Sequence, residues 1–178
     1  MTNALIVVDM LIDFIRKNGK LPVGPTAEAI IAFVKDEVEE HRHAGDLIIW
    51  LCDAHTPDDL EFKRFPDHAV AGTSGADIIS ELDALIHINA GNEVLIPKTR
   101  YSGFYNTTLA VVLEQAKPEA TTVVGVCTSI CVMDTVGGLA NRDYPNIIVP
   151  KKAVADFDQD AHNAALKRME ALYGANII

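Results

Sequence analysis

The sequence predicts an α/β protein with a doubly wound, mainly parallel β-sheet and helices on both faces, which makes three layers. Short apolar runs rich in β-branched residues recur along the chain, and amphipathic segments of helical periodicity separate them. Strands that alternate with helices form parallel sheets, because each helix returns the chain to the same edge. The 178 residues show no internal repeat or linker, so we expect a single domain over residues 1–178.

The first part of the chain contains two predicted strands with a helix between them. Residues 4–8 are apolar throughout, as expected for a strand buried on both faces, and the run ends at Asp9. The second strand, residues 47–52, ends at Asp53. The intervening helix ends at Gly45, and its apolar face is formed by Ile30, Phe33, Val34 and Val38.

A long segment rich in Asp, Pro and Gly, residues 54–74, follows the second strand. A loop of this length in a compact domain is usually functional. A third strand, residues 94–96, ends at Pro97-Lys98. Between loop and strand we expect a helix with Ile78, Ile79, Leu82, Leu85 and Ile86 on one face.

The last part of the chain repeats the same alternation of helices and strands. Its final helix begins after Asp158 and directs Leu166, Met169 and Leu172 inward. The other predicted elements are helix 108–115, strand 122–126, helix 129–140, strand 146–149 and a short edge strand at 176–178.

Residues that can take part in catalysis or bind a ligand lie at the ends of four of these strands. Asp9, Asp53 and Lys98 each come directly after a strand, and residues 127–131 follow the fourth. In open parallel sheets ligands bind beyond the carboxyl ends of the strands, where the strand order reverses. We therefore expect these residues to meet at one edge of the sheet.

Cys131 is the candidate nucleophile. It lies where a strand gives way to a helix N-terminus, a place that favours the reactive thiolate. Asp9 can carry the proton, and Lys98 can hold both the carboxylate and the sulfur by charge. Backbone N–H groups of the loop from Cys127 to Cys131 can stabilise an oxyanion. Taken alone, a cysteine in an apolar strand–helix unit is more often a core residue, and the joint placement favours the catalytic interpretation.

The long loop carries a candidate metal site. Asp53 and His55 are two residues apart, and Glu61 and His68 follow. Carboxylate and imidazole groups are good ligands for Zn²⁺, Mn²⁺ or Fe²⁺. Solvated loop residues would show the same spacing, so the pattern leaves both interpretations open. The other histidines, which we interpret as solvated, are His41, His43, His87 and His162.

Composition limits the function classes. The formal net charge of −10 opposes binding to nucleic acid or to an anionic membrane. No apolar run approaches the length of a membrane span, and the N-terminus lacks the basic region of a signal peptide. Three cysteines without a short-spaced framework indicate a reducing, cytoplasmic location.

Five motifs follow one another along most of the chain. They are Val7-Val8-Asp9-Met10-Leu11-Ile12-Asp13-Phe14, Asp53-Ala54-His55, Phe65-Pro66-Asp67-His68 with the following Gly72 to Asp77, Lys98 to Phe104, and Gly125 to Val132. In this order they resemble the nicotinamidase branch of the isochorismatase-like cysteine hydrolases, so the resemblance implies the fold of that family.

The resemblance implies the hydrolysis of nicotinamide to nicotinate in NAD salvage, through a thioester on Cys131. Asp9 would shuttle the proton and Lys98 would orient the charges. A cis peptide bond between Val126 and Cys127 would direct the Cys127 and Cys131 amides towards the oxyanion.

The family also implies a substrate-holding metal, zinc first and manganese or iron as alternatives, bound to the pyridine nitrogen. Phe14 and Tyr101 would flank the ring by stacking. A glutamate replaces a histidine that many relatives carry among the metal ligands, which adds a negative charge. The implied ligands are Asp53, His55, Glu61 and His68.

Other functions remain open at this point. A related cysteine amidase could act on another small carboxamide or carbamoyl compound without a catalytic metal, and a non-catalytic binding module could keep the same fold. A vinyl ether hydrolase would have no need of Cys131. A redox role for Cys127 and Cys131 is disfavoured by their C-x-x-x-C spacing. Relatives commonly self-associate, so we expect a homo-oligomer.

Overall fold

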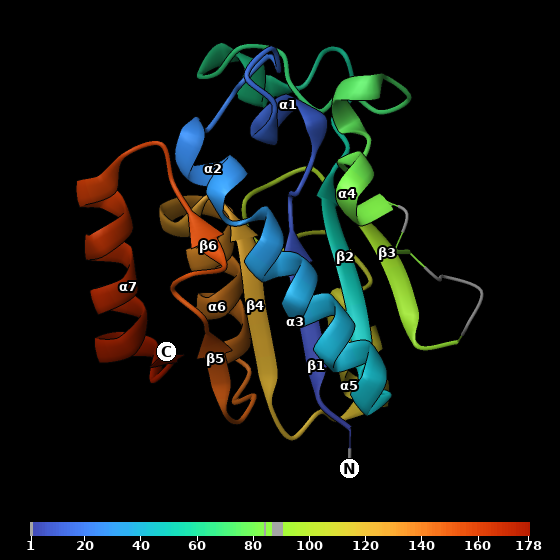
Figure 1. Cartoon of the computed structure of the whole chain (residues 1–178), viewed down its shortest axis with the longest axis vertical. Helices are drawn as coiled ribbons and strands as arrows, with labels where there is room; N and C mark the ends of the chain where they lie inside the picture. The colour runs from blue at the N-terminus through green and yellow to red at the C-terminus, as the bar shows by residue number, and fades with distance from the viewer. Residues whose placement is uncertain (1, 84, 87–90) are drawn as a thin grey trace.

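The computed structural model describes residues 2–83, 85–86 and 91–178. These residues form one seven-stranded sheet whose strand pairs are all parallel. The strand order is β3-β2-β1-β4-β5-β7, with β6 beside β4 (Figure 1). The strands are β1 (Ala4–Val8), β2 (Leu47–Asp53), β3 (Glu93–Lys98), β4 (Thr121–Val126), β5 (Ile147–Val149), β6 (Val154–Ala155) and β7 (Asn176–Ile177).

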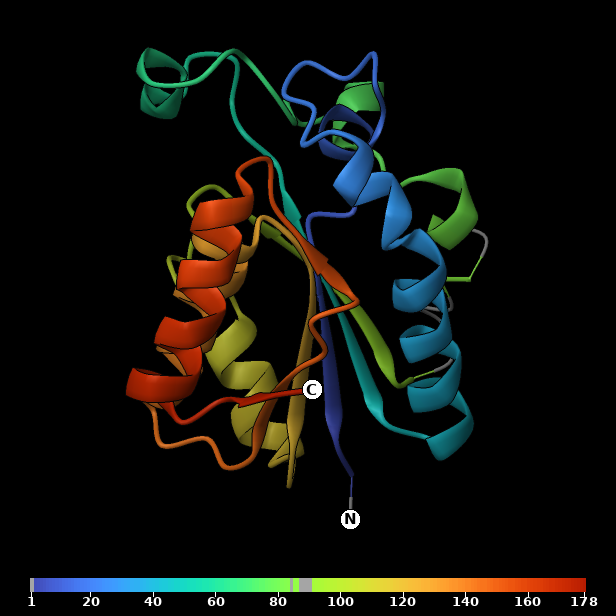
Figure 2. The same cartoon turned by 60° about the vertical axis from the view of Figure 1, so that its left-hand side comes forward.

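Helices cover both faces of the sheet, which confirms the predicted three-layer α/β fold. Figure 2 shows α2, α3 and α4 on one face and α5, α6 and α7 on the other. Among the described residues, no helix is long and apolar enough to span a membrane. The helices are α1 (Ile12–Ile15), α2 (Pro25–Ala29), α3 (Ile31–Ala44), α4 (Ser80–Asp83), α5 (Leu109–Ala116), α6 (Met133–Ala140) and α7 (Gln159–Tyr173).

Strand β1 shows why the sequence of a strand inside this sheet is a continuous apolar run. Leu5 and Val7 belong to the core beneath α3, whereas Ile6 and Val8 belong to the core beneath α5 and α6. All five residues of β1 are buried, so both faces of the strand need apolar side chains. Each such side chain contributes about 1.5–3 kcal/mol when it is fully removed from water.

The helix ends follow the signals in the sequence. Gly45 ends α3 with φ of 76°, and Gly174 ends α7 with φ of 65°, in the left-handed region that glycine tolerates. Asp158 caps α7 by accepting hydrogen bonds from the N–H groups of Asp160 and Ala161. These ends were predicted correctly.

Two predicted inward side chains face solvent instead. Phe33 is 44% exposed and Leu172 is 63% exposed. In α7 the residues that reach the sheet are Ala165 and Met169, one turn apart, and Leu172 lies to the side of this narrow stripe. The predicted helix before Gly45 is also divided, since α2 and α3 meet at Ile30.

Three further elements differ from the prediction. The helix expected over Ile78 to Ile86 is reduced to α4, because Ile78 pairs with Leu11 in an isolated β-bridge. The helix expected from Ser129 begins as a π-helical turn, Thr128–Val132, before α6. Strand β6 was missed because its two residues are too few to show a pattern.

The strand order places a switch point between β1 and β4. Strands β2 and β3 extend the sheet on one side of β1, and β4 and β5 extend it on the other. A crevice therefore opens beyond the carboxyl ends of β1 and β4, the ordinary place for a ligand in such a sheet. Asp9 follows β1 and Cys131 follows β4 at this point.

Candidate active site

A cavity of about 310 Å³ opens at this switch point. Lys98 and His55, which do not line it, are buried in close contact with Asp53, which does. The residues that line the cavity are Asp9, Phe14, Leu21, Pro22, Val23, Asp53, Glu61, Phe65, His68, Tyr101, Val126, Cys127, Ile130, Cys131 and Phe157.

Lys98 holds the first group of predicted residues together. Its Nζ donates a hydrogen bond to Asp53 Oδ1 at 2.6 Å, lies 2.7 Å from Asp9 Oδ2 and donates to Cys131 Sγ at 3.5 Å. The register of β2 and β3 pairs Asp53 with Lys98, which brings the two side chains to one place. Burial lowers the pKa of Lys98, but the charges of Asp53 and Asp9 raise it well above its ordinary value. The side chain is therefore a buried ammonium.

Asp9 has a carboxylate oxygen that can accept a proton. Its φ of 52° is unusual for a non-glycine residue and turns the chain sharply after β1. Asp9 Oδ1 accepts a hydrogen bond from the Asp53 N–H at 2.8 Å. Asp9 Oδ2 faces Lys98, but the contact is not aligned as a hydrogen bond, so a lone pair stays available. Burial and the Asp53 charge raise the pKa of Asp9 to about 6, against the lowering effect of Lys98.

Cys131 lies in the π-helical turn that leads into α6, and it is buried. Its sulfur lies within 4.8 Å of a carboxylate oxygen of Asp9 and of Asp53. Burial raises the pKa of Cys131 well above its ordinary value, and Lys98 offsets this only in part. Burial therefore opposes the thiolate that the sequence predicts, and the Lys98 charge favours it.

The loop between Cys127 and Cys131 has the backbone arrangement that the family resemblance implies. The Val126–Cys127 peptide bond is cis. The Cys127 carbonyl accepts hydrogen bonds from the N–H groups of Ile130 and Val132, both at 3.1 Å. Cys127 lines the cavity, so its backbone lies at the cavity wall, where the resemblance places an amide that stabilises the oxyanion.

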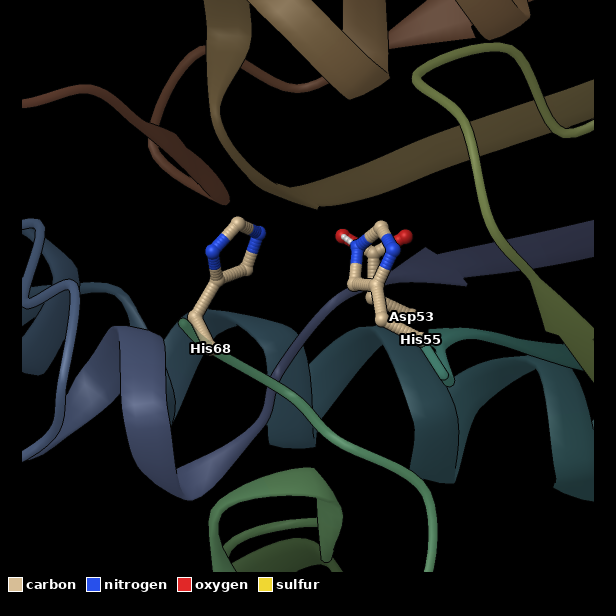
Figure 3. Close-up of side chains that lie close together, drawn as sticks. All are labelled: Asp53, His55 and His68. Atoms are coloured by element: carbon tan, nitrogen blue, oxygen red, sulfur yellow. Dashed lines mark ion pairs between the residues drawn. The ribbon is translucent and has the colours of Figure 1, made fainter. Parts of the chain in front are cut away.

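The predicted metal ligands also come together. Asp53, His55 and His68 each offer a ligand atom, and these atoms all lie within 4.8 Å of one another. Figure 3 shows the three side chains extending to the same side of the chain segments that carry them. Glu61 is not part of this group of three but lies beside it, with Oε1 3.8 Å from His68 Nε2. All four residues are buried.

The unpaired atoms in this cluster fit a bound cation. Among the described residues, His55 Nε2 and Glu61 Oε2 are buried without any hydrogen-bond partner. Leaving such groups unpaired costs about 1–3 kcal/mol each, and a cation would satisfy both. His68 Nδ1 lies 2.7 Å from the Pro66 carbonyl, so its Nε2 is free to face the cluster.

The charge of the cluster also fits a cation. Burial lowers the pKa of His55, but the neighbouring carboxylates, Asp53 and Asp59 foremost, raise it to about 8. Two imidazoles and two carboxylates in a buried place form a mixed N/O donor set suited to Zn²⁺, Mn²⁺ or Fe²⁺. The residues present therefore fit the divalent metal that the resemblance implies.

The remaining cavity wall is mostly apolar. The rings of Phe14 and His68 pack with centroids 5.4 Å apart, and the Tyr101 hydroxyl accepts a 3.5 Å hydrogen bond from Arg64. The sequence named the wall residues Phe65, Val126 and Ile130 only as parts of motifs, and it did not indicate Leu21, Pro22, Val23 and Phe157 at all.

Two charged residues beside the metal cluster were also missed. Asp59 contacts His55 at 3.0 Å, and Arg100 contacts Asp59 at 2.9 Å. The only feature of the sequence that could have indicated these two residues is their position. Asp59 comes four residues after His55, and Arg100 comes two residues after Lys98. Loop charges of this kind are usually solvated, so the sequence gives no reason to select them.

Of the other histidines, the three that the structure describes do not line the cavity. His41 pairs with Asp46 at 2.8 Å, and His162 Nδ1 lies 2.9 Å from the Thr128 hydroxyl, so neither is simply solvated as predicted. His43 is exposed, as predicted. His87 lies outside the described residues.

Comparison with known proteins identifies a family. The isochorismatase domain matches residues 3–178. A protein of Bacillus subtilis (strain 168), described as the uncharacterized isochorismatase family protein PncA, is 34% identical over 182 residues, which cover 99% of each chain.

Solved structures give the same result. The pyrazinamidase/nicotinamidase of Streptococcus mutans UA159 superposes with a TM-score of 0.95 at 33% identity, over 99% of this chain and 100% of the other. The pyrazinamidase of Pyrococcus horikoshii, solved in complex with zinc, gives a TM-score of 0.88 at 28% identity, over 100% and 99% of the chains. The chain therefore belongs to the isochorismatase family and is an amidohydrolase.

Proposed function

We propose that the protein is a metal-dependent nicotinamidase that hydrolyses nicotinamide to nicotinate and ammonia in NAD salvage. One observation supports this most strongly. One cavity is lined by Asp9 and Cys131 and also by the donor residues Asp53, Glu61 and His68, and Lys98 and His55 are buried in contact with Asp53. The substrate therefore needs a carbonyl carbon for the sulfur and a second atom that binds a metal, separated by a flat apolar body. Nicotinamide has these features, and two similar structures carry pyrazinamidase in their names.

The donor set fixes the orientation of the substrate. A divalent cation held by these residues would bind the pyridine nitrogen and leave the carboxamide directed at the sulfur. Phe14 and Tyr101 line the space between and can contact the two faces of an aromatic ring. Glu61 takes a direct ligand position in this proposal, since its Oε2 has no other partner among the described residues.

The first half-reaction forms a thioester. As Cys131 Sγ attacks the carboxamide carbon, its proton moves to Asp9 Oδ2, and the carbonyl oxygen becomes an oxyanion. The backbone N–H groups of Cys127 and Cys131 stabilise that oxyanion. The C–N bond then breaks, and the leaving nitrogen takes the proton from Asp9 and departs as ammonia.

The second half-reaction restores the enzyme. Asp9 removes a proton from a water molecule that attacks the thioester carbon, and the same oxyanion position is used again. The C–S bond breaks, the proton on Asp9 returns to the Cys131 sulfur, and the product leaves as nicotinate once its carboxyl group has lost its proton to the solvent. Lys98 stays charged throughout, and it compensates the carboxylates of Asp9 and Asp53 in both halves.

The direct test measures ammonia release from nicotinamide before metal removal, after full chelation, and after return of Zn²⁺, Mn²⁺ or Fe²⁺ to separate samples. We expect activity to disappear on chelation and to return with at least one of these ions. Full activity in the metal-free protein would refute the metal role. No release from nicotinamide by the metal-loaded protein, with release from another small carboxamide or carbamoyl compound, would favour the related amidase.

The nucleophile is tested with two cysteine variants. We expect Cys131→Ala to abolish turnover, whereas Cys127→Ala should be nearly neutral because only the backbone of Cys127 acts. Activity in Cys131→Ala together with its loss in Cys127→Ala would show that the wrong cysteine has been chosen. If neither the protein nor its variants turned over any carboxamide, the non-catalytic binding module would be the better interpretation.

A further inference from the structure

Asp59 is a contact point for two of the proposed metal ligands, although it does not line the cavity. It precedes a short 3₁₀ turn, Leu60–Lys63, and its Oδ1 accepts a hydrogen bond from the Glu61 N–H at 2.9 Å. Its Oδ2 lies 3.0 Å from His55 Nδ1. One carboxylate thus contacts the backbone of one ligand and the ring of another.

Arg100 holds that carboxylate in place. Its Nη1 donates to Asp59 Oδ1 at 2.9 Å and to Asp59 Oδ2 at 3.0 Å. The Asp59 side chain is 6% exposed, which is unusual for an aspartate in a loop. Because Arg100 is only two residues beyond Lys98, the pair joins the metal loop to the segment that carries the catalytic ammonium.

We propose that Asp59, held by Arg100, is a positioning residue for the metal site. The proposal rests on the metal dependence proposed above. With Asp59 accepting at Nδ1, the proton of the neutral His55 ring is on Nδ1, and the Nε2 lone pair is directed at the cluster, where Nε2 has no hydrogen-bond partner and lies 3.6 Å from Asp53 Oδ2. The hydrogen bond to the Glu61 N–H fixes the turn that carries the carboxylate ligand.

If Asp59 served only to cap the 3₁₀ turn, Asp59→Asn would leave the metal site unchanged. Asparagine caps a helical turn about as well as aspartate, so Asp59→Asn preserves the contact with the Glu61 N–H. The substituted amide, however, turns its NH₂ group towards His55 Nδ1. That arrangement favours the tautomer with the proton on Nε2, where the metal would bind. The substitution therefore separates capping from ligand positioning.

The experiment titrates metal-free protein with Zn²⁺ in competition with a chromophoric chelator, without substrate. We expect Asp59→Asn to bind Zn²⁺ about 10- to 100-fold more weakly than the wild type. The matched control is Asp58→Asn, which makes the same chemical change at the exposed neighbouring position and should keep wild-type affinity. Both metal-free variants should melt at similar temperatures. The Co²⁺ absorption spectrum should change only in Asp59→Asn.

A second pair of variants tests the role of Arg100. Because a single nitrogen of Arg100 contacts both Asp59 oxygens, one ammonium can replace it, so Arg100→Lys should retain more Zn²⁺ affinity than Arg100→Ala. If Asp59→Asn does not fold, the comparison of Arg100→Lys with Arg100→Ala still tests the positioning role. Wild-type affinity in Arg100→Ala, or wild-type affinity with an unchanged Co²⁺ spectrum in Asp59→Asn, would overturn the proposal.

Failure of the proposed function has a different signature. A wild-type protein that binds no Zn²⁺ would refute the metal role, and with it the positioning role. A wild-type protein that binds Zn²⁺ but releases no ammonia from nicotinamide would refute only the proposal that nicotinamide is the substrate. In that case the comparison of Asp59→Asn with Asp58→Asn still tests the positioning role.

Discussion

Lys98 is a buried ammonium that faces two carboxylates and a thiol. A charge in such a place is stable only while it is paired, and the same holds for Asp9 and Asp53. The three residues therefore depend on one another for stability as well as for chemistry. Removing one of them leaves an uncompensated charge in the core.

Lys98→Met tests this dependence. We expect the metal-free variant to lose about 3–5 kcal/mol in the free energy of unfolding, because Asp9 and Asp53 then face each other without a cation. Adding Asp9→Asn should recover part of the loss, since one of the two charges is removed. Urea unfolding of the wild type, both single variants and the double variant measures this coupling. Strictly additive effects would contradict it.

Single residues differ in how far the sequence could predict them. Asp9, Lys98 and Cys131 were predictable because each lies at or beyond the carboxyl end of a strand, and parallel strands bring these ends to one edge. Asp59 and Arg100 were not predictable, because they meet only through the path of a long loop. The burial that raises the pKa of Cys131 was not predictable either, since local sequence shows the helix N-terminus but not the depth of burial.

At the scale of elements, the backbones of β1 and β4 leave no room for a side chain at Gly125. Its φ is 111°, and a Cβ built there would lie 2.0 Å from the Val8 carbonyl oxygen. Neither strand backbone can shift easily to relieve this contact, because β1 and β4 are adjacent strands inside the sheet. Glycine is therefore required directly before the cis peptide at the cavity.

Gly125→Ala should be strongly destabilising, and Gly24→Ala is its matched control. Gly24 has a similar φ of 105°, but nothing lies within 4 Å of its Cβ position. Backbone strain costs about 1–3 kcal/mol at either site, so any further loss in Gly125→Ala measures the contact with β1. Urea unfolding gives both values. Equal losses in the two variants would show that the close approach is unimportant.

An exposed ion pair links α1 to α4 and gives a pH-dependent prediction. The hydrogen bond from Arg16 lowers the pKa of Glu81 from 4.5 to about 2. A lowered folded-state pKa means that the stabilisation is complete above pH 4.5 and is lost as the pH falls through about 2. Because Glu81 is 43% exposed, solvent limits the contribution to about 1 kcal/mol or less.

Glu81→Gln isolates this contribution. The variant should be slightly less stable than the wild type at pH 7, and the difference should shrink as the pH is lowered towards 2. Urea unfolding at pH 7, 4 and 2.5 measures the free energy of unfolding of both proteins. A difference that stays constant over this range, or that grows in acid, would contradict the role of the ion pair.

The elements were predictable in proportion to their length and burial. The strand β1 and the helix α7 carry clear patterns and clear ends, whereas β6 has two residues and α4 has four. The β-bridge between Leu11 and Ile78 overrides the helical periodicity that follows the long loop. Tertiary pairing of this kind cannot be read from a local pattern.

At the scale of the whole molecule, the proposed metal site joins β2 to the long loop. Asp53 ends β2, whereas His68 lies 15 positions further along the chain and is held by packing against Phe14. Binding at such a site requires the folded arrangement, so bound metal should stabilise the entire fold. Residues 1–178 as one domain, assembly into a homo-oligomer and a cytoplasmic location stay predictions.

Zinc should therefore raise the melting temperature of the metal-free protein. At a free Zn²⁺ concentration of 100 times Kd, the free energy of unfolding should rise by about 2.7 kcal/mol. His68→Ala should abolish most of this shift, and His43→Ala, at an exposed position, should leave it intact. Differential scanning calorimetry measures the shift. An equal shift in both variants would place the binding elsewhere.

The covalent intermediate tests the proposed chemistry most directly. The metal-loaded protein is mixed with nicotinamide, quenched in acid during turnover and digested. Mass spectrometry then analyses the peptide that contains Cys52 and the peptide that contains both Cys127 and Cys131, and fragmentation of the second peptide assigns the modified cysteine. We predict a nicotinoyl thioester on Cys131, and none on Cys52 or Cys127. A nicotinoyl group on Cys127, or its absence from all three cysteines while ammonia is being released, would contradict the proposed mechanism.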